Sequence, residues 1–174
     1  MSEDQTNTSQ EAGPISLEVK GLIVDPSSPN TPIVILKEVG GTRFLPIWIG
    51  LFEANAIAFK LDDVEPPRPM SHDLMANLVR ELGATVRRII VSDLIENTFY
   101  AQIILDVGGQ ERIIDSRPSD AIALALRFDA EIFATQAVFS KAKVSDLVEK
   151  VQDEEQIREW LESVDPEDLG KYTM

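Results

Sequence analysis

The chain has 174 residues, no cysteine and a formal net charge of −14 at pH 7. This length fits a single domain with tails, and 44% hydrophobic residues are enough to form a buried core. The absence of cysteine excludes disulfides, thiolate nucleophiles and zinc–thiolate sites. No apolar run approaches the ~20 residues that span a bilayer, and the first residues lack the basic and apolar regions of a signal peptide. We therefore expect a cytoplasmic protein without membrane contact.

The negative charge is concentrated in the two ends of the chain. Residues 1–14 carry three acids (−3), residues 15–140 carry 17 acids and 11 Lys or Arg (−6), and residues 141–174 carry ten acids and five bases (−5). An acidic body argues against tight nonspecific binding of nucleic acid, because such binding neutralises phosphates with Lys and Arg. An enzyme can still meet a phosphate locally, through a metal ion or a few arginines.

Runs of alternating or periodically spaced apolar residues predict strands and helices over most of the chain. Residues 1–14 are predicted to be a disordered acidic tail. The body, 15–140, reads as three strands, two helices, three strands, a helix and a short strand, at 15–24, 31–38, 42–49, 51–61, 72–82, 84–94, 98–107, 110–115, 118–128 and 131–134. The run 138–142 is too short to assign, and 141–174 predict an acidic helical tail with helices at 144–150 and 153–164. This order is typical of a single α+β domain, with helices packed on a largely antiparallel or mixed sheet.

Local signals predict several of the turns and helix starts. Two Gly-Gly pairs, at 40–41 and 108–109, each separate two strand-like runs. They predict hairpins, because the tight turns of hairpins need positive φ. Ser71 is predicted to cap the helix over 72–82. Pro118 suits the first position of a helix, where its missing N–H costs nothing.

Two polar corners hold the residues best suited to chemistry. Residues 115–120 (DSRPSD) lie between a predicted strand and a predicted helix. Residues 68–73 (RPMSHD) precede another helix and include the only histidine of the chain. Glu53 adds a third carboxylate, early in a helix that is otherwise rich in alanine and apolar residues. These are the places where we look for a site.

Several motifs in this order and spacing resemble the bifunctional nuclease family over about 15–140. They are 46–50 (PIWIG), 53–54 (EA), 68–69 (RP), 71–74 (SHDL), 98–101 (TFYA) and 115–125 (DSRPSDAIALA). The resemblance implies an enzyme that degrades both DNA and RNA, as plant members of the family are described to do. It supplies no set of catalytic residues by position, so the roles below are inferred from residue chemistry.

We predict His72, Asp73 and Arg117 as catalytic residues. A histidine titrates near neutrality and can act as a general base or acid, although it can equally hydrogen-bond a neighbouring loop. Asp73 has a structural alternative as a favourable charge in the first turn of a helix. Arg117 can clamp a phosphate through two N–H groups, or pin the turn through an ion pair with Asp115 or Asp120.

The carboxylates of Asp115, Asp120 and Glu53 are predicted to bind a divalent metal ion. Mg²⁺ and Mn²⁺ prefer hard oxygen ligands, and a bound cation would remove the repulsion between an acidic protein and a phosphodiester. For Asp120 and Glu53 the structural alternative is a negative charge that stabilises a helix N-terminus, and this alternative is weaker for Asp115.

Two functions of different class remain open at this stage. The first is a metal-assisted nuclease that hydrolyses phosphodiester bonds of DNA and RNA and binds nucleic acid only weakly. The second is a non-catalytic, oligomeric regulatory or ligand-binding module, favoured by the acidic charge and by the absence of a strong catalytic motif. A homo-oligomer is expected in either case, because few helices are available to cover many apolar strand residues.

Overall fold

The computed structural model describes residues 13–25 and 28–142. The predicted tails at 1–14 and 141–174, with the helices expected at 144–150 and 153–164, lie almost wholly outside these residues. Within the described part of the chain, no helix is long and apolar enough to cross a membrane.

The first half of the chain forms three strands and a helix at the places that the apolar pattern predicts. They are β1 (Ile15–Asp25), β2 (Ser28–Glu38), β3 (Phe44–Trp48) and α1 (Leu51–Leu61). The second half forms the remaining predicted elements and one more helix, α4, in the short run that the pattern left unassigned. They are α2 (Ser71–Glu81), β4 (Ala84–Ile95), β5 (Thr98–Val107), β6 (Gln110–Ser116), α3 (Pro118–Phe128), β7 (Glu131–Ala134) and α4 (Gln136–Lys141).

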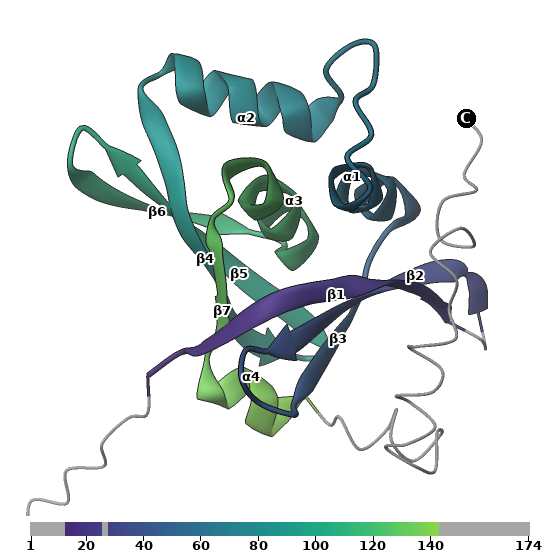
Figure 1. The fold of residues 1–174 in the computed structure, drawn as a ribbon. Coiled ribbons are helices and arrows are strands. Elements are labelled where there is room, and N and C mark those ends of the chain that lie inside the picture. Colours follow the sequence, from purple (N-terminus) through teal and green to yellow (C-terminus); the bar gives the residue numbers. More distant parts are fainter. Residues whose placement is uncertain (1–12, 26–27, 143–174) are drawn as a thin grey trace, which may run out of the picture.

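The described strands form one seven-stranded sheet in the order β3-β2-β1-β7-β4-β5-β6 (Figure 1). Neighbouring strands are antiparallel, with the exception of β4 and β7, which run parallel. This mixed sheet with helices packed on it confirms the predicted α+β single domain.

Both Gly-Gly pairs join antiparallel strands, as predicted. The first connects β2 to β3 and the second connects β5 to β6. Gly108 and Gly109 have φ of 60° and 84°. Because glycine adopts such angles without steric cost, the Gly-Gly pair favours this two-residue hairpin turn.

The predicted cap of α2 is wrong by one residue. The helix begins at Ser71, and Met70 is the residue before it in extended conformation. The Ser71 hydroxyl therefore caps nothing, and the Asp73 carboxylate instead accepts a hydrogen bond from the Met70 N–H at 2.9 Å. Aspartate in the first turn satisfies a free backbone donor in the same way that a serine cap would.

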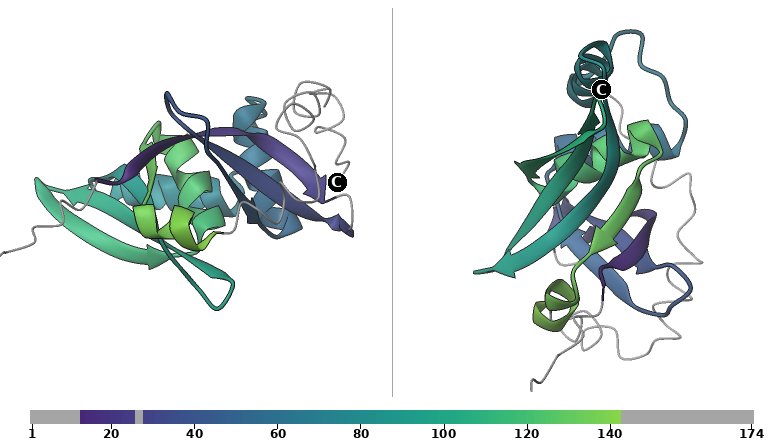
Figure 2. Two further views of the ribbon diagram at one scale, coloured as in Figure 1. Left: turned by 90° about the horizontal axis from the view of Figure 1, so that it is seen from below. Right: turned by 90° about the vertical axis from the view of Figure 1, so that its left-hand side faces the viewer.

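The helices α1 and α3 lie against the sheet, and α2 lies across α3 as the outermost of the three (Figure 1). The sheet curves, so that its halves on either side of β7 both face α1 and α3 (Figure 2). One large cluster of buried residues fills this space; it includes Val34, Leu36, Ile57, Ile89 and Ile122. The core therefore holds the starts of the helices in fixed relative positions.

Candidate functional site at the start of three helices

Three helices begin near one point and bring together side chains that are far apart in the sequence. Glu53 is the third residue of α1, His72 is the second of α2 and Asp120 is the third of α3. Arg117 immediately precedes α3. The positive end of each helix dipole favours negative charge here. We refer to Glu53, His72, Arg117 and Asp120 as the three-helix corner.

Arg117 lies between two carboxylates. Its Nε donates to Asp120 Oδ2 at 2.7 Å, and its Nη2 donates to Asp120 Oδ1 at 3.1 Å and to Glu53 Oε1 at 2.8 Å. The Arg117 side chain is 65% exposed, and its Nη1 donates to no group within the described residues. The guanidinium is thus held along one edge, while its other edge is open to solvent.

Gly50 leaves the space that the Glu53 carboxylate occupies. A Cβ added at Gly50 would lie 2.2 Å from Glu53 Oε2. A side chain at this position would therefore displace Glu53 from Arg117. The lack of a side chain at Gly50 is therefore what makes room for the carboxylate of Glu53 three residues later.

His72 is the buried member of the corner. Its Nε2 lies 2.9 Å from Asp120 Oδ1, and the residue is only 7% exposed. Within the described residues, every fully buried side-chain nitrogen or oxygen has a hydrogen-bond partner. The imidazole is therefore oriented by Asp120, through the same Oδ1 that also accepts from Arg117 Nη2.

The charge state of Asp120 determines which nitrogen of His72 carries the proton. Burial by itself raises the pKa of Asp120, but hydrogen bonds from Arg117 and His72 outweigh burial and leave that pKa below its usual value. Asp120 is therefore ionised at neutral pH and can only accept hydrogen bonds. It follows that Nε2 carries a proton and that the lone pair of a neutral His72 is on Nδ1.

Asp73 points away from the corner. Its Oδ1 accepts from Arg127 Nε at 2.7 Å, and Arg127 also donates to the main-chain carbonyls of Ala56 and Ala123. The Arg127 side chain is only 6% exposed. This contact ties α1, α2 and α3 together, so the geometry favours the structural alternative for Asp73 over the predicted catalytic role.

Asp115 does not share the space of Asp120. In the β5–β6 ladder, Ile114 pairs with the core residue Ile103, while Asp115 pairs with Gln102. Paired residues share a face and neighbours alternate, so Asp115 points to the face of the sheet opposite the core. Asp115 and Asp120 are five positions apart in the sequence, but their side chains lie on different sides of the sheet.

The predicted metal ligands are not assembled into a metal site. Within the described residues, no three His, Cys, Asp or Glu side chains are grouped so that they could share an ion. Glu53 and Asp120 already bind the Arg117 guanidinium, and Asp115 is on the other face. The residues present therefore do not fit a resident divalent ion in this arrangement, and we derive no step through one.

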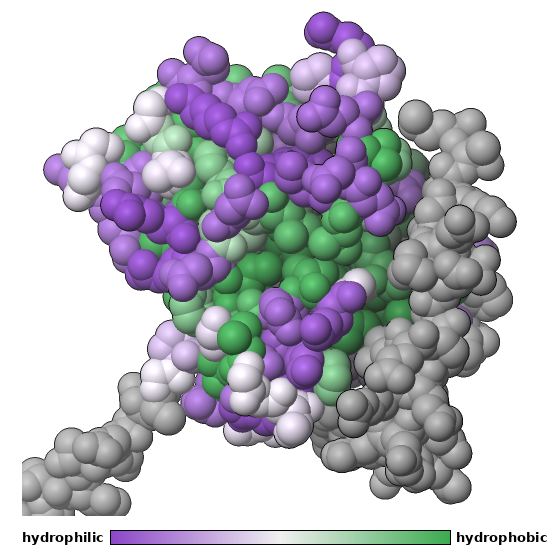
Figure 3. All heavy atoms as spheres, viewed as in Figure 1, coloured by the Kyte–Doolittle hydropathy of each residue, from purple (hydrophilic) through white to green (hydrophobic). Residues whose placement is uncertain are grey.

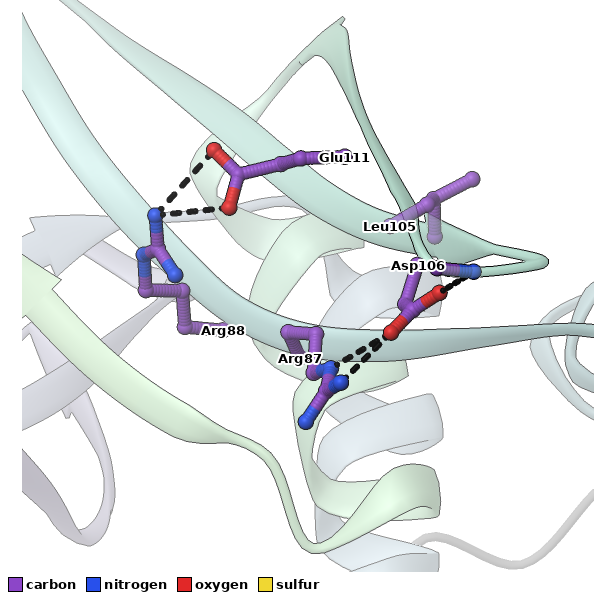
Figure 4. A pocket seen from close by; sticks show the side chains of 6 residues that line it. Arg87, Arg88, Leu105, Asp106 and Glu111 are labelled. Carbon is purple, nitrogen blue, oxygen red and sulfur yellow. Dashed lines mark hydrogen bonds and ion pairs between the residues drawn. The ribbon is translucent and has the colours of Figure 1, made fainter.

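A shallow cavity of about 250 Å³ lies on the face of β4, β5 and β6 opposite the core (Figure 4). The pairing register shifts between Val86 and Arg88, and this bulge lets Arg87 and Arg88 both line the cavity. Arg87 binds Asp106 at 2.5 Å, and Arg88 binds Glu111 at 3.1 Å. Both arginines are thus paired with carboxylates, and the four charges of this cavity cancel.

Comparison with known proteins gives the family. The model of the bifunctional nuclease domain matches residues 34–146. The chain belongs to the bifunctional nuclease domain family.

An uncharacterized protein of Mycobacterium tuberculosis is 40% identical over 151 residues, which are 80% of this chain and 89% of that protein. Bifunctional nuclease 1 of Arabidopsis thaliana is 29% identical over 103 residues, and Bifunctional nuclease 1 of Oryza sativa subsp. japonica is 28% identical over 104. Each plant match covers 58% of this chain but only 32% or 31% of the plant protein.

The matched region of this bifunctional nuclease domain contains the whole three-helix corner. The residues predicted from the sequence include all four of this corner but not two others, Arg127 and Phe52. Arg127 follows the apolar run 121–126 in α3, and a cation after such a run can signal a buried partner such as Asp73. Phe52 lies next to Glu53 at the start of α1, and its side chain is 85% exposed. The sequence signal for it is an aromatic residue directly before a charged residue at a helix start.

The lowered pKa of Asp120 predicts how acid affects this domain. A carboxyl whose pKa is lower in the folded state contributes stability that is fully present above its unfolded pKa of about 3.9 and is lost as the pH falls through the folded value. We expect Asp120→Asn to remove this contribution. In urea denaturation at pH 7 and pH 3, the variant should therefore lose less stability on acidification than the wild type. An equal loss in both proteins would contradict the assignment.

Proposed function

We propose that the three-helix corner hydrolyses phosphodiester bonds of DNA and RNA. The observation that carries this proposal is an exposed guanidinium with a free edge, held next to a histidine–aspartate pair. An arginine that is fixed in position can bind a phosphate oxygen, and a histidine oriented by a carboxylate can move a proton. Membership in the bifunctional nuclease domain family supports the same reaction.

The proposed reaction uses three side chains. Arg117 Nη1 binds a non-bridging oxygen of the phosphodiester. A water molecule gives its proton to Nδ1 of His72 as its oxygen attacks phosphorus. The bond from phosphorus to the leaving oxygen breaks, and the imidazolium returns the proton to that oxygen. Asp120 stabilises the imidazolium in between, because its carboxylate stays ionised.

Binding of the polyanion should be weak. The corner holds two carboxylates and one guanidinium, so its formal charge with a neutral His72 is −1. The starts of three helices add partial positive charge and free backbone donors, which favour a phosphate at close range. The exposed ring of Phe52 also offers a surface on which a nucleobase can stack.

The divalent metal predicted from the sequence stays a prediction. A metal bound by Glu53 and Asp120 would have to replace Arg117 between their carboxylates. A chelator therefore distinguishes hydrolysis by the side chains alone from hydrolysis that needs a metal ion. Cleavage that survives a chelator is the result expected from the side chains alone, and cleavage that needs Mg²⁺ or Mn²⁺ would support a metal that displaces Arg117.

The test is cleavage of single-stranded DNA and RNA by purified protein, with and without chelator. Arg117→Gln should lower the rate by about 100- to 1000-fold, the usual cost of removing one donor that stabilises developing charge. Its melting temperature should stay within a few degrees, because the Arg117 side chain is largely exposed. Arg112→Gln is the matched control: Arg112 is also exposed and binds only Gln110, so cleavage should be unchanged.

The second candidate is a non-catalytic oligomeric module. One observation favours it: the charged groups of the corner are already paired with one another. Wild-type protein that cleaves neither nucleic acid, with or without Mg²⁺ or Mn²⁺, would establish this alternative and reject the nuclease. We propose a homo-oligomer under both functions. The cytoplasmic location expected from the sequence stays a prediction as well.

A further inference from the structure

The helix α2 presents a stripe of large apolar side chains to solvent. Leu74, Leu78 and Leu82 recur every fourth residue, and all three are more than half exposed, with Leu82 at 79%. Met70 and Met75 flank them and are also exposed. We call these five residues the α2 stripe. A helix on the surface of a monomer normally turns charged and polar residues to this side.

The opposite side of α2 already has its packing partner. His72 and Ala76 are buried there, and Val79 packs against the core. Arg80 stacks on Phe128, with its guanidinium carbon 4.4 Å from the ring centroid. In Figure 1, α2 lies across α3 with this inner side toward the body. The residues of the α2 stripe keep from 36% to 79% of their surface exposed in one chain, and this apolar surface is left for a partner.

We propose that the α2 stripe is the contact between two copies of this chain, with the two α2 helices antiparallel and Leu78 near the two-fold axis. Residues at i, i+4 and i+8 form a continuous ridge on a helix. Two identical ridges of this kind interdigitate at about −50°, the commonest class of helix packing. In this arrangement Leu74 of each copy faces Leu82 of the other, as a self-complementary two-fold contact requires.

Charge and area favour a second copy over other occupants. A charged partner such as nucleic acid would need charged groups in the stripe, and none of its five residues is charged. Two copies with a net charge of −14 each repel one another, so an uncharged surface is the one that favours their contact. Five half-exposed Leu and Met side chains offer on the order of 500 Å² per copy, most of the roughly 800 Å² per partner in a standard interface.

The contact also bears on the three-helix corner, because α2 carries His72. A second copy on the outer side would hold α2 from both sides and keep His72 against Asp120. The assembly itself does not depend on the nuclease activity. Its mass can be measured whether or not the protein cleaves nucleic acid.

The experiment is light scattering on the wild type and two variants from 1 to 100 μM. The wild type should have twice the 19.3 kDa mass of one chain, and Leu78→Asp should have the mass of one chain. Asn77→Asp adds the same charge one residue away, about 100° round the helix, and should keep the wild-type mass. The wild-type melting temperature should rise with concentration, and that of Leu78→Asp should not.

Two outcomes would overturn the proposal. One is a wild-type protein that has the mass of one chain at 100 μM. The other is a Leu78→Asp variant that keeps the wild-type mass. If Leu78→Asp fails to fold, Leu82→Asp gives the same reading, because Leu82 is the most exposed residue of the stripe and contributes least to the fold.

Discussion

Asp73→Asn is expected to lower the free energy of unfolding by about 2–3 kcal/mol at pH 7. The substitution removes the charge that compensates the buried Arg127 guanidinium, and breaking such a pair typically costs about 3–5 kcal/mol. We expect the lower part of that range or less, because Asp73 is partly exposed and Arg127 keeps two carbonyl acceptors. The pKa of Asp73 supports a real interaction: burial raises it, but the Met70 N–H and Arg127 together lower it below its usual value. Urea denaturation measures the change.

Asp93→Asn provides the control for this prediction. Asp93 pairs with Lys141, but both side chains are substantially exposed, so its loss should cost about 1 kcal/mol or less. Equal losses in the two variants would show that Arg127 is not held by Asp73. Replacing the pair by Asp73→Leu and Arg127→Met together should recover much of the stability, since no buried charge is then left without a partner.

His72→Gln is expected to slow cleavage by about 1000- to 10,000-fold, which is more than the loss expected for Arg117→Gln. Glutamine can still donate to Asp120, so the fold should survive, but it cannot take a proton at neutral pH. The measurement is the single-turnover rate on the same DNA and RNA substrates, compared with melting temperature.

A rescue experiment separates proton transfer from packing. His72→Ala leaves a space beside Asp120 that a free imidazole can enter. Added imidazole should restore part of the rate in this variant and should leave Arg117→Gln unchanged. A His72→Gln variant that cleaves as fast as the wild type would place the proton acceptor elsewhere.

Most of the fold could be predicted from the sequence, because the signals are local. The Gly-Gly pair at 108–109 determines a hairpin turn by its φ angles, and Pro118 marks the start of α3. The start of α2 could not be located from Ser71, because the donor at Met70 is satisfied by Asp73 instead. The parallel pairing of β7 with β4 has no local signal, since a four-residue apolar strand fits many places in a sheet.

The sequence predicts the candidate site only in part, because some of its contacts join residues that are far apart along the chain. Arg117 and Asp120 are close in sequence, and their ion pair is one of the two roles that the sequence predicts for Arg117. Asp115 is equally close, but the two-residue period of β6 turns it to the other face. The contact of Glu53 with Arg117 joins positions 64 apart, and only the tertiary packing of α1 on α3 determines it.

The position of β7 determines when this sheet can form during synthesis. One half of the sheet consists of β1, β2 and β3, and the other half consists of β4, β5 and β6. The strand β7 lies between the halves and pairs with β1 on one side and with β4 on the other. The four residues of β7 are thus the seam between two hairpin-built halves, and they follow the other six described strands in the chain. Until residue 134 emerges, the nascent chain exposes two open sheet edges that are buried in the finished molecule. Such edges can pair with other chains, so we expect aggregation to compete with folding most strongly in this interval.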